Sequence, residues 1–298
     1  FNNVRFLSSA VNKNMTILND DLLFTGVLVG ASTYIDLYKY NDNNSAGVSL
    51  VIDFPSNAYI IGTITNVNDK VFFLLGSNGT EIWTTKGKQS NTKLVKKFDY
   101  SYVLNNNGAS LNGEFYFTNF DTTYGFELWK SDGTHQGTVQ LTNAANPSGF
   151  FSITGFKGNV YFSFNDGVHG TELWITDGTM QGTHIVKDFT QGSGRVSPEN
   201  FFVFKDKLFF IGEAPIDTRA LYTTDGTEEG TTEFFNCGEE GCKYPSILND
   251  QLFFVSDDTI FSHPNNELYV SDGTKEGTHL FLEINPDFIG ATGEMIAA

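Results

Sequence analysis

An internal repeat of about 46 residues constrains this chain more than any other feature of its sequence. A segment of the form Glu-Leu-Trp-x-x-Asp-Gly-Thr, best preserved from Glu172 to Thr179, recurs along the chain. Its copies begin at positions 36, 81, 127, 172, 220 and 267, which are 45, 46, 45, 48 and 47 residues apart. Chains with such a period stack one structural unit on the next, so the repeat decides the architecture.

Each repeat contains four short apolar runs separated by turn-forming residues, as in 201–204, 208–210, 220–222 and 234–235. Asn-Asp, Asn-Gly, Lys-Gly or Lys-Asp pairs precede the second run, and such pairs favour hairpins because they tolerate positive φ. No amphipathic helical stretch of useful length is present. The pattern predicts an all-β chain, a six-bladed β-propeller of four-stranded antiparallel blades forming one domain over residues 1–298. An open array or a two-sheet sandwich is the alternative.

The chain ends bear on how such a ring closes. The stretch Val4–Leu7 is a candidate outer strand for the last blade. The tail Asn285–Ile289 resembles Asn146–Phe150, where a repeat begins. Either the tail helps to close the ring, or the chain is part of a longer one. The start at Phe1, without Met or a leader, is typical of a processed or excised product.

The recurring motif residues have structural explanations. Strand alternation places the acidic and aromatic positions on one face, where a large ring fills the gap between neighbouring blades. The Asp of Asp-Gly-Thr accepts hydrogen bonds from backbone N–H groups two residues on, and its Gly takes positive φ. We therefore interpret the motif as architecture, with worn copies in the first two repeats. Its residues are Glu81, Trp83, Glu127, Trp129, Asp132, Glu172, Trp174, Asp177, Asp225, Glu267 and Asp272.

The run from Asn165 to Phe189, which contains ELWITDGTMQGTHIVKDF, resembles the repeat of the ELWxxDGT-repeat proteins. The resemblance covers about residues 12 to 285, with four good copies and two that depart from the pattern. It implies an extracellular repeat module of a secreted or surface protein, and it assigns no catalytic residues. The Asp-Gly-Thr turn is also similar to the Asp-box turn of sialidase-type propellers, itself a structural element.

Charge narrows the range of partners. The chain has 35 Asp and Glu residues against 18 Lys and Arg, which gives a formal net charge of −17. Such a surface repels phosphate backbones and anionic lipid headgroups. No apolar run reaches the length of about 18 residues that a membrane-spanning helix needs. We expect neither a nucleic-acid partner nor a membrane span.

Cysteines and sequons favour an extracellular location. Cys237 and Cys242 are separated by four residues, two of them glycines, so a local disulfide is the favoured interpretation and free thiols are the alternative. A zinc site would need further ligands, which are absent nearby. Three sequons make Asn14, Asn43 and Asn78 candidate glycosylation sites.

Catalytic and metal-binding patterns are scarce. Three arginines in unrelated contexts do not match a sialidase, no pair of acidic residues stands out as a glycosidase pair, and the five histidines lack ligand spacing. Calcium is the one ion that we consider, with Asp166, Asp257 and Asp258 in oxygen-rich loops as weak candidate ligands. No other cofactor is expected.

Three functional hypotheses follow. The first is a non-enzymatic extracellular binding or adhesion module that recognises glycans or proteins. The second is a structural subunit of an extracellular filament or surface coat, in which the chain binds itself. The third is a propeller enzyme acting on a carbohydrate or lactone through loop residues over the central channel.

Overall fold

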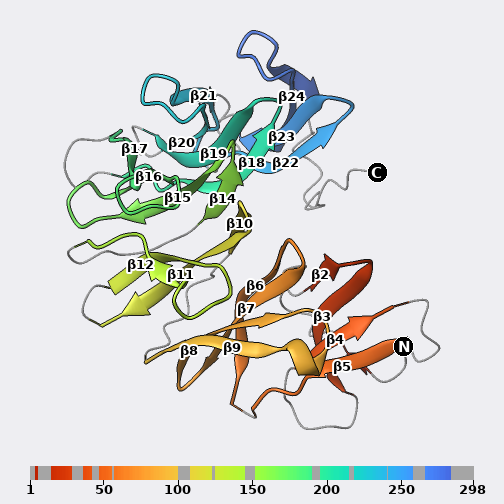
Figure 1. Ribbon diagram of the computed structural model, residues 1–298. Helices are drawn as coiled ribbons and strands as arrows, with labels where there is room; N and C mark the ends of the chain where they lie inside the picture. Colours follow the sequence, from red (N-terminus) through yellow and green to blue (C-terminus); the bar gives the residue numbers. More distant parts are fainter. Residues whose placement is uncertain are drawn as a thin grey trace. The chain divides into compact units, whose positions relative to one another are not determined.

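The computed structural model of the chain consists almost entirely of antiparallel β-structure (Figure 1). Among the described residues the one helical segment is a single 3-10 turn, η1 (Gln89–Asn91), and no helix is long and apolar enough to cross a membrane. The structure describes residues 4–5, 15–28, 36–41, 47–55, 57–99, 108–122, 125–144, 152–189, 195–214, 218–239, 241–257 and 266–282.

Six sheets follow one another along the chain, one for each repeat, and in each the strands pair in chain order from an inner to an outer strand. The first sheet alone has a fifth strand, β1 (Val4–Arg5). The four strands of the first three sheets are β2 (Met15–Leu18), β3 (Asp21–Leu28), β4 (Asp36–Tyr40) and β5 (Val48–Ile52); β6 (Tyr59–Val67), β7 (Lys70–Ser77), β8 (Gly79–Thr85) and β9 (Lys93–Phe98); and β10 (Ala109–Leu111), β11 (Glu114–Asp121), β12 (Gly125–Ser131) and β13 (Val139–Gln140).

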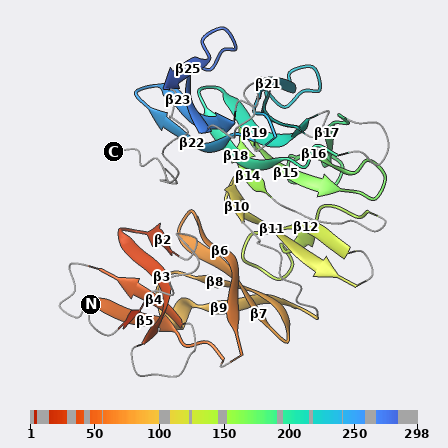
Figure 2. The same ribbon diagram turned by 180° about the vertical axis from the view of Figure 1, so that it is seen from behind.

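The last three sheets repeat the same order of strands (Figure 2). The predicted fold, a six-bladed β-propeller with four-stranded antiparallel blades, is confirmed, whereas ring closure stays a prediction. The strands are β14 (Ile153–Phe156), β15 (Asn159–Asn165), β16 (Thr171–Thr176) and β17 (His184–Lys187); β18 (Glu199–Phe204), β19 (Lys207–Ala214), β20 (Thr218–Thr224) and β21 (Thr232–Asn236); and β22 (Lys243–Leu248), β23 (Gln251–Asp257), β24 (Asn266–Ser271) and β25 (His279–Leu282).

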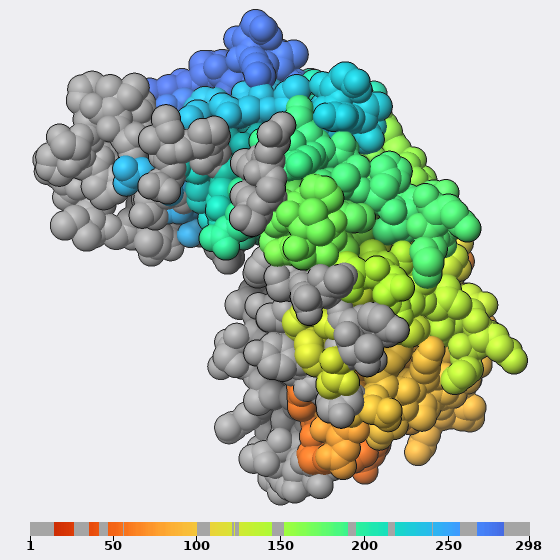
Figure 3. Space-filling view, turned by 90° about the vertical axis from the view of Figure 1, so that its left-hand side faces the viewer, coloured from red at the N-terminus to blue at the C-terminus, as the bar shows by residue number. Residues whose placement is uncertain are grey.

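The chain forms two compact units. The first contains Phe1–Gly167 and Thr176–His184, and the second contains Val168–Ile175 and Ile185–Ala298. Within the first unit, residues of the second and third sheets, coloured orange to yellow-green, follow one another on the surface (Figure 3).

Two-residue turns join the inner strand of every sheet to the second strand. The first residue of each turn has a positive φ of 46° to 59°, the conformation that such hairpins need. These residues are the Asn or Lys of the pairs predicted from the sequence, so that prediction is confirmed. They are Asn19, Asn68, Asn112, Lys157, Lys205 and Asn249.

The core consists of apolar side chains between consecutive sheets. In the second sheet Val71 and Phe73 join a buried cluster with residues of the first sheet, whereas Phe72 and Leu74 join one with Phe115 of the third sheet. Alternation along β7 thus sends successive side chains to opposite neighbours. A blade buried on both faces explains why the second run of each repeat is continuously apolar.

One sequence-based expectation about the chain ends differs from the structure. Val4–Arg5 does not complete the last blade, because β1 pairs with Val27–Leu28 of β3 in the first sheet. The second repeat, although it lacks the Asp-Gly turn, forms a four-stranded sheet with the same strand order as the other repeats. The tail Asn285–Ile289 lies outside the described residues.

Candidate functional site

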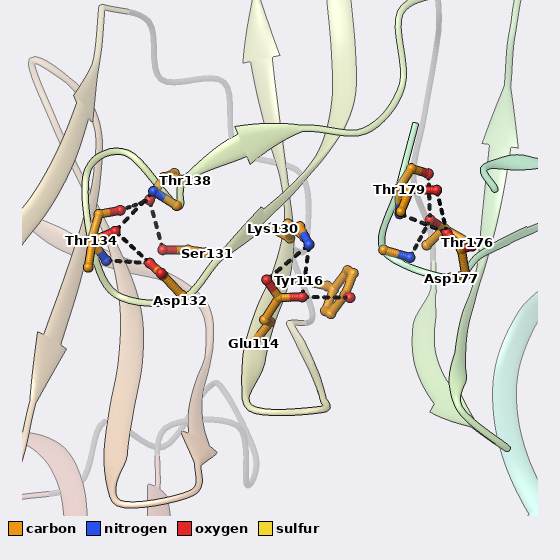
Figure 4. Close-up of polar contacts among 12 residues, drawn as sticks. Glu114, Tyr116, Lys130, Ser131, Asp132, Thr134, Thr138, Thr176, Asp177 and Thr179 are labelled. Carbon is orange, nitrogen blue, oxygen red and sulfur yellow. Dashed lines mark hydrogen bonds and ion pairs between the residues drawn. The ribbon is translucent and has the colours of Figure 1, made fainter. Parts of the chain in front are cut away.

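The Asp-Gly-Thr segment forms the turn between the third and the outer strand of its sheet. In the third repeat Asp132 Oδ1 accepts hydrogen bonds from the Thr134 backbone N–H at 2.8 Å and from the Thr134 hydroxyl at 2.7 Å (Figure 4). The Thr134 hydroxyl oxygen then accepts from the backbone N–H of Gly137 at 2.9 Å. A chain of short-range bonds thus closes the turn from both sides.

A pair of buried hydroxyls fixes the base of the turn. Ser131 Oγ lies 2.8 Å from Thr138 Oγ1 and accepts from the backbone N–H of Gly133. The same set of contacts recurs in the fourth, fifth and sixth repeats. The corresponding Asp residues are Asp177, Asp225 and Asp272, each of which accepts from the Thr two positions on.

Both glycines of the turn are required, for different reasons. Gly133 has φ of +89°, which side chains resist. Gly137 lies outside that region of φ, but a Cβ there would overlap the Asp132 carboxylate. The later glycine of the other three repeats faces its own Asp in the same way. The repeat therefore couples an Asp at one position to a glycine five positions later.

The second repeat reverses this arrangement. Lys86 stands at the Asp position and Asn91 at the position of the later glycine. The Asn91 side-chain oxygen accepts from the backbone N–H groups of Lys86 and Lys88, at 3.2 and 3.0 Å. Thr85 and Thr92 keep the hydroxyl pair at 2.7 Å. An acceptor from the opposite side of the turn replaces the carboxylate, so this copy, worn in sequence, forms a complete turn.

Acid is expected to weaken these turns. Hydrogen bonds from the Thr side chain and backbone hold the pKa values of Asp132, Asp177 and Asp272 below the ordinary 3.8. Because the folded pKa is the lower one, the stabilisation is present above about pH 4 and lost as the pH falls through the folded pKa. We expect the Tm of the variant with Asp132, Asp177 and Asp272 changed to Asn to fall less between pH 6 and pH 2.5 than the Tm of the unmodified chain, as measured by circular dichroism.

The amide oxygen of Asn still accepts both bonds, so this variant removes the titration and keeps the turn. A variant with Glu228, Glu229 and Glu276 changed to Gln is the matched control, because it removes the same number of charges from exposed positions. Equal acid sensitivity in the two variants would contradict the expectation.

In the first two repeats the acidic and the aromatic residue of the motif bind each other along their strand. Trp83 Nε1 donates to Glu81 Oε2 at 3.1 Å, and Lys97 Nζ lies 2.8 Å from the other carboxylate oxygen. In the first repeat the Tyr38 hydroxyl donates to Asp36 at 3.0 Å. Burial, then the nearby Asp36 carboxylate, raises the pKa of Tyr38 to about 12.

In the other repeats the Glu position varies in its contacts. In the third repeat Glu127 is fully buried and accepts from the Thr142 hydroxyl and the Ala144 backbone N–H, while Trp129 Nε1 has no hydrogen-bond partner among the described residues. Glu172 is also fully buried, on β16 together with Trp174. In the sixth repeat the Tyr269 hydroxyl lies 3.5 Å from Glu267.

An aromatic residue at the end of each of several outer strands contacts the next blade, a role that the sequence interpretation missed. Phe98 lies 5.0 Å from Trp129 and 6.2 Å from Phe117, measured between ring centroids. Phe189 contacts the pair Phe210 and Tyr222 in the same manner. The signal was available, because the VKDF sequence ends in this Phe and KKF in the second repeat matches it.

Lysines beside these aromatic residues join neighbouring blades. Lys96 Nζ lies 4.5 Å from the Trp129 ring centroid and donates to the Thr138 carbonyl. Lys187, at the same repeat position, donates to the Thr231 carbonyl at 2.9 Å. Lys96 thus binds both the face of the Trp129 ring and a turn carbonyl of the next blade.

A polar group lies between two consecutive turns (Figure 4). The Glu114 carboxylate accepts from Lys130 Nζ at 2.9 and 3.0 Å and from the Tyr116 hydroxyl at 3.3 Å. A Cβ on Gly178, in the Asp177 turn, would overlap the Tyr116 hydroxyl. Close approach between the third sheet and the next turn is a second reason for glycine there.

The predicted disulfide is confirmed. Cys237 and Cys242 are bonded and buried, with 5.0 Å between their Cα atoms. Backbone hydrogen bonds of Arg219 to Cys237 and Gly238 attach this loop to β20. The disulfide cluster packs with Leu252 and other residues of the last two sheets.

The calcium and glycosylation candidates stay predictions. Asp166 follows β15 and Asp257 ends β23, while Asp258 lies outside the described residues. No group of three or more His, Cys, Asp or Glu side chains suited to a metal ion occurs in the described part of the chain, and calcium stays a prediction. Asn78 is exposed in the turn between β7 and β8, whereas Asn14 and Asn43 lie outside the described residues.

Comparison with known proteins supports the fold alone. No family model and no curated protein sequence matches the chain. Prolyl oligopeptidase B from Galerina marginata is similar in structure, with a TM-score of 0.57 and 12% identity over 92% of this chain. A puromycin hydrolase gives a TM-score of 0.53 and 12% identity over 89%.

The chain spans 43% and 44% of those two structures, less than half of each. A chain of a nidogen/laminin complex matches over 80% of this chain and 86% of its own length, with 14% identity. Its TM-score of 0.42 is too low to carry an argument. The similar structures therefore support a propeller fold, whereas activity and partners are matters of proposal.

Proposed function

We propose that this chain is an extracellular, non-enzymatic binding module that recognises a protein or glycan ligand. The observation that carries the proposal is the use of the repeated polar side chains. The Asp residues of four turns bind their own Thr residues, and Glu81 and Glu127 bind groups of their own sheets. The repeat thus serves as a scaffold, and recognition belongs to the side chains that differ between repeats.

Two further features support this location and mode of action. The buried disulfide is typical of proteins that fold in an oxidising compartment. The net charge of −17 favours basic ligands and raises their rate of association. The resemblance to ELWxxDGT-repeat proteins supports the same extracellular role.

A binding screen tests the proposal. The immobilised chain is exposed to a glycan array and to a panel of purified extracellular proteins, acidic and basic, at 50 and 500 mM NaCl. We expect at least one ligand with a Kd of about 10 μM or tighter, with binding to basic proteins weaker at high salt because the charges are screened.

The scaffold role of the turns supplies a control. The Asp177→Asn variant keeps its acceptor oxygen and is expected to bind the same ligand with unchanged affinity. Hydrolysis of a glycan, ester or peptide that one point substitution abolishes would contradict the proposal. So would the absence of any ligand in the complete screen.

A further inference from the structure

The stretch from β8 to β9 in the second sheet reverses the charge of its equivalents. Residues 82–98 contain five lysines and no Asp or Glu, in a chain with 35 acidic and 18 basic residues. The equivalent stretch of the fifth repeat, residues 221–237, has four acidic residues and no Lys or Arg. None of the other four equivalent stretches has an excess of basic residues. The five lysines are Lys86, Lys88, Lys93, Lys96 and Lys97.

Four of these lysines are exposed on and beside one turn, and we call them the basic patch. Lys86 and Lys88 lie in the turn between β8 and β9, and Lys93 and Lys97 lie on β9 itself. The Asn91 side chain, two residues before β9, accepts from the backbone N–H groups of both turn lysines. The exchange of Asp-Gly-Thr for Lys-Gly-Lys thus keeps the turn closed and places cations where other repeats have a carboxylate.

Neighbouring acidic side chains neutralise only part of the basic patch. Two of its lysines have acidic partners, Asp69 and Glu81. The other two, Lys88 and Lys93, form no ion pair with a described residue. The second sheet packs against the first and the third sheet, which belong to the same compact unit. The positive charge is therefore a property of this unit by itself.

The composition of the basic patch indicates the chemical class of its ligand. Short lysine-rich segments are typical of surfaces that bind nucleic acids or sulfated polysaccharides. Residues 86–97 contain no Arg and no aromatic residue, the side chains that usually anchor a protein interface. The buried disulfide is typical of an oxidising compartment, where sulfated polysaccharides are the common polyanions. These features together favour a sulfated polysaccharide over an acidic protein or a nucleic acid.

We propose that the basic patch binds a sulfated polysaccharide. Sulfate groups contact the ammonium groups of Lys88 and Lys93, which are point charges without a fixed fork and suit spaced anions on a flexible chain. Gln89 and Ser90, exposed between them, offer an amide and a hydroxyl to the sugar hydroxyls. This inference rests on the proposed function and names the class of its ligand.

The acidic remainder of the chain limits this ligand to a short contact. Charges are screened over about 8 Å at physiological ionic strength, so the lysines dominate the field next to the basic patch. The net charge of −17 repels the parts of a polyanion that extend beyond it. We therefore expect moderate affinity and a strong dependence on salt, because each ammonium–sulfate contact releases counterions.

Fluorescence anisotropy with a labelled heparin hexasaccharide tests the proposal on the full chain. We expect a Kd of about 10 μM in 50 mM NaCl, about tenfold weaker binding in 200 mM NaCl, and about tenfold weaker binding of the desulfated hexasaccharide. Changing Lys88 and Lys93 together to Glu should weaken binding about tenfold or more. Changing Lys207 and Lys275 to Glu is the matched control, because both are exposed and the net charge changes equally. The control should weaken binding less than about twofold.

Lysine acetylation of the unmodified chain, read by mass spectrometry, keeps the test independent of any variant. We expect the hexasaccharide to protect Lys88 and Lys93 from acetylation and to leave Lys207 and Lys275 as reactive as before. Equal reactivity of all four lysines with and without the hexasaccharide would overturn the proposal.

Three other results would overturn it as well. They are no binding of the hexasaccharide in 50 mM NaCl, an equal loss in the two variants, and tighter binding of duplex DNA or polyglutamate than of the hexasaccharide. A ligand from the earlier screen that binds the Lys88 and Lys93 variant with unchanged affinity would overturn this inference alone and leave the proposed function standing. The absence of every ligand would overturn both.

Discussion

Replacing Phe73 by alanine is expected to lower the free energy of unfolding by about 4 kcal/mol, the largest single effect we predict. Phe73 is fully buried on β7 and lies in the cluster shared by the first two sheets. Its ring lies 5.7 Å from that of Phe54 and is stacked on Trp83 at 6.4 Å. The substitution leaves a cavity that rigid neighbouring strands cannot fill.

Urea denaturation followed by far-UV circular dichroism measures this loss. Leu94→Ala in the same sheet is the control, because Leu94 is 45% exposed and its removal should cost less than about 0.5 kcal/mol. Adding Phe54→Ala to Phe73→Ala should cost less than the sum of the single changes, since the two rings share one contact. If the losses of the two single variants simply add, the contact between Phe73 and Phe54, which follows the outer strand β5, does not stabilise the two sheets as we describe.

Exchanging the polar groups of the turn in the third repeat is expected to reveal a large energetic coupling between residues 132 and 137, measured in the free energy of unfolding. Gly137→Asn alone should lower the free energy of unfolding by about 2 kcal/mol, because the new side chain overlaps the Asp132 carboxylate. Combining it with Asp132→Lys rebuilds the arrangement of Lys86 and Asn91 in the second repeat. The double variant should recover more than about 1 kcal/mol of that loss.

A neighbouring glycine provides the control for this cycle. Gly133→Ala should also destabilise the turn, because Gly133 has φ of +89°. Asp132→Lys should not rescue it, since the strain there lies in the backbone and involves no overlap with the carboxylate. If Asp132→Lys fails to rescue Gly137→Asn, the second repeat closes its turn for a different reason.

Sequence reasoning predicted much of the local structure because that structure depends on near neighbours. The hairpin pairs and the Asp-Gly-Thr turns consist of residues within a few positions of one another, so their backbone angles follow from residue type. The worn second repeat shows the limit of this reasoning. Asn91 replaces the carboxylate from a position where the motif has glycine. Only the tertiary structure reveals that Asn91 and the Asp of the other repeats accept from the backbone N–H at the same position of the turn.

The sequence by itself determined that the chain is a succession of six four-stranded blades, because period and alternation are properties of the chain alone. Tertiary structure decided how consecutive blades bind each other: Phe98 packs against Trp129, Lys96 donates to the Thr138 carbonyl, and Phe204 packs against Gly273. It also decided that Glu127 is fully buried. Burial depends on what covers a side chain, and residues distant in sequence supply that cover.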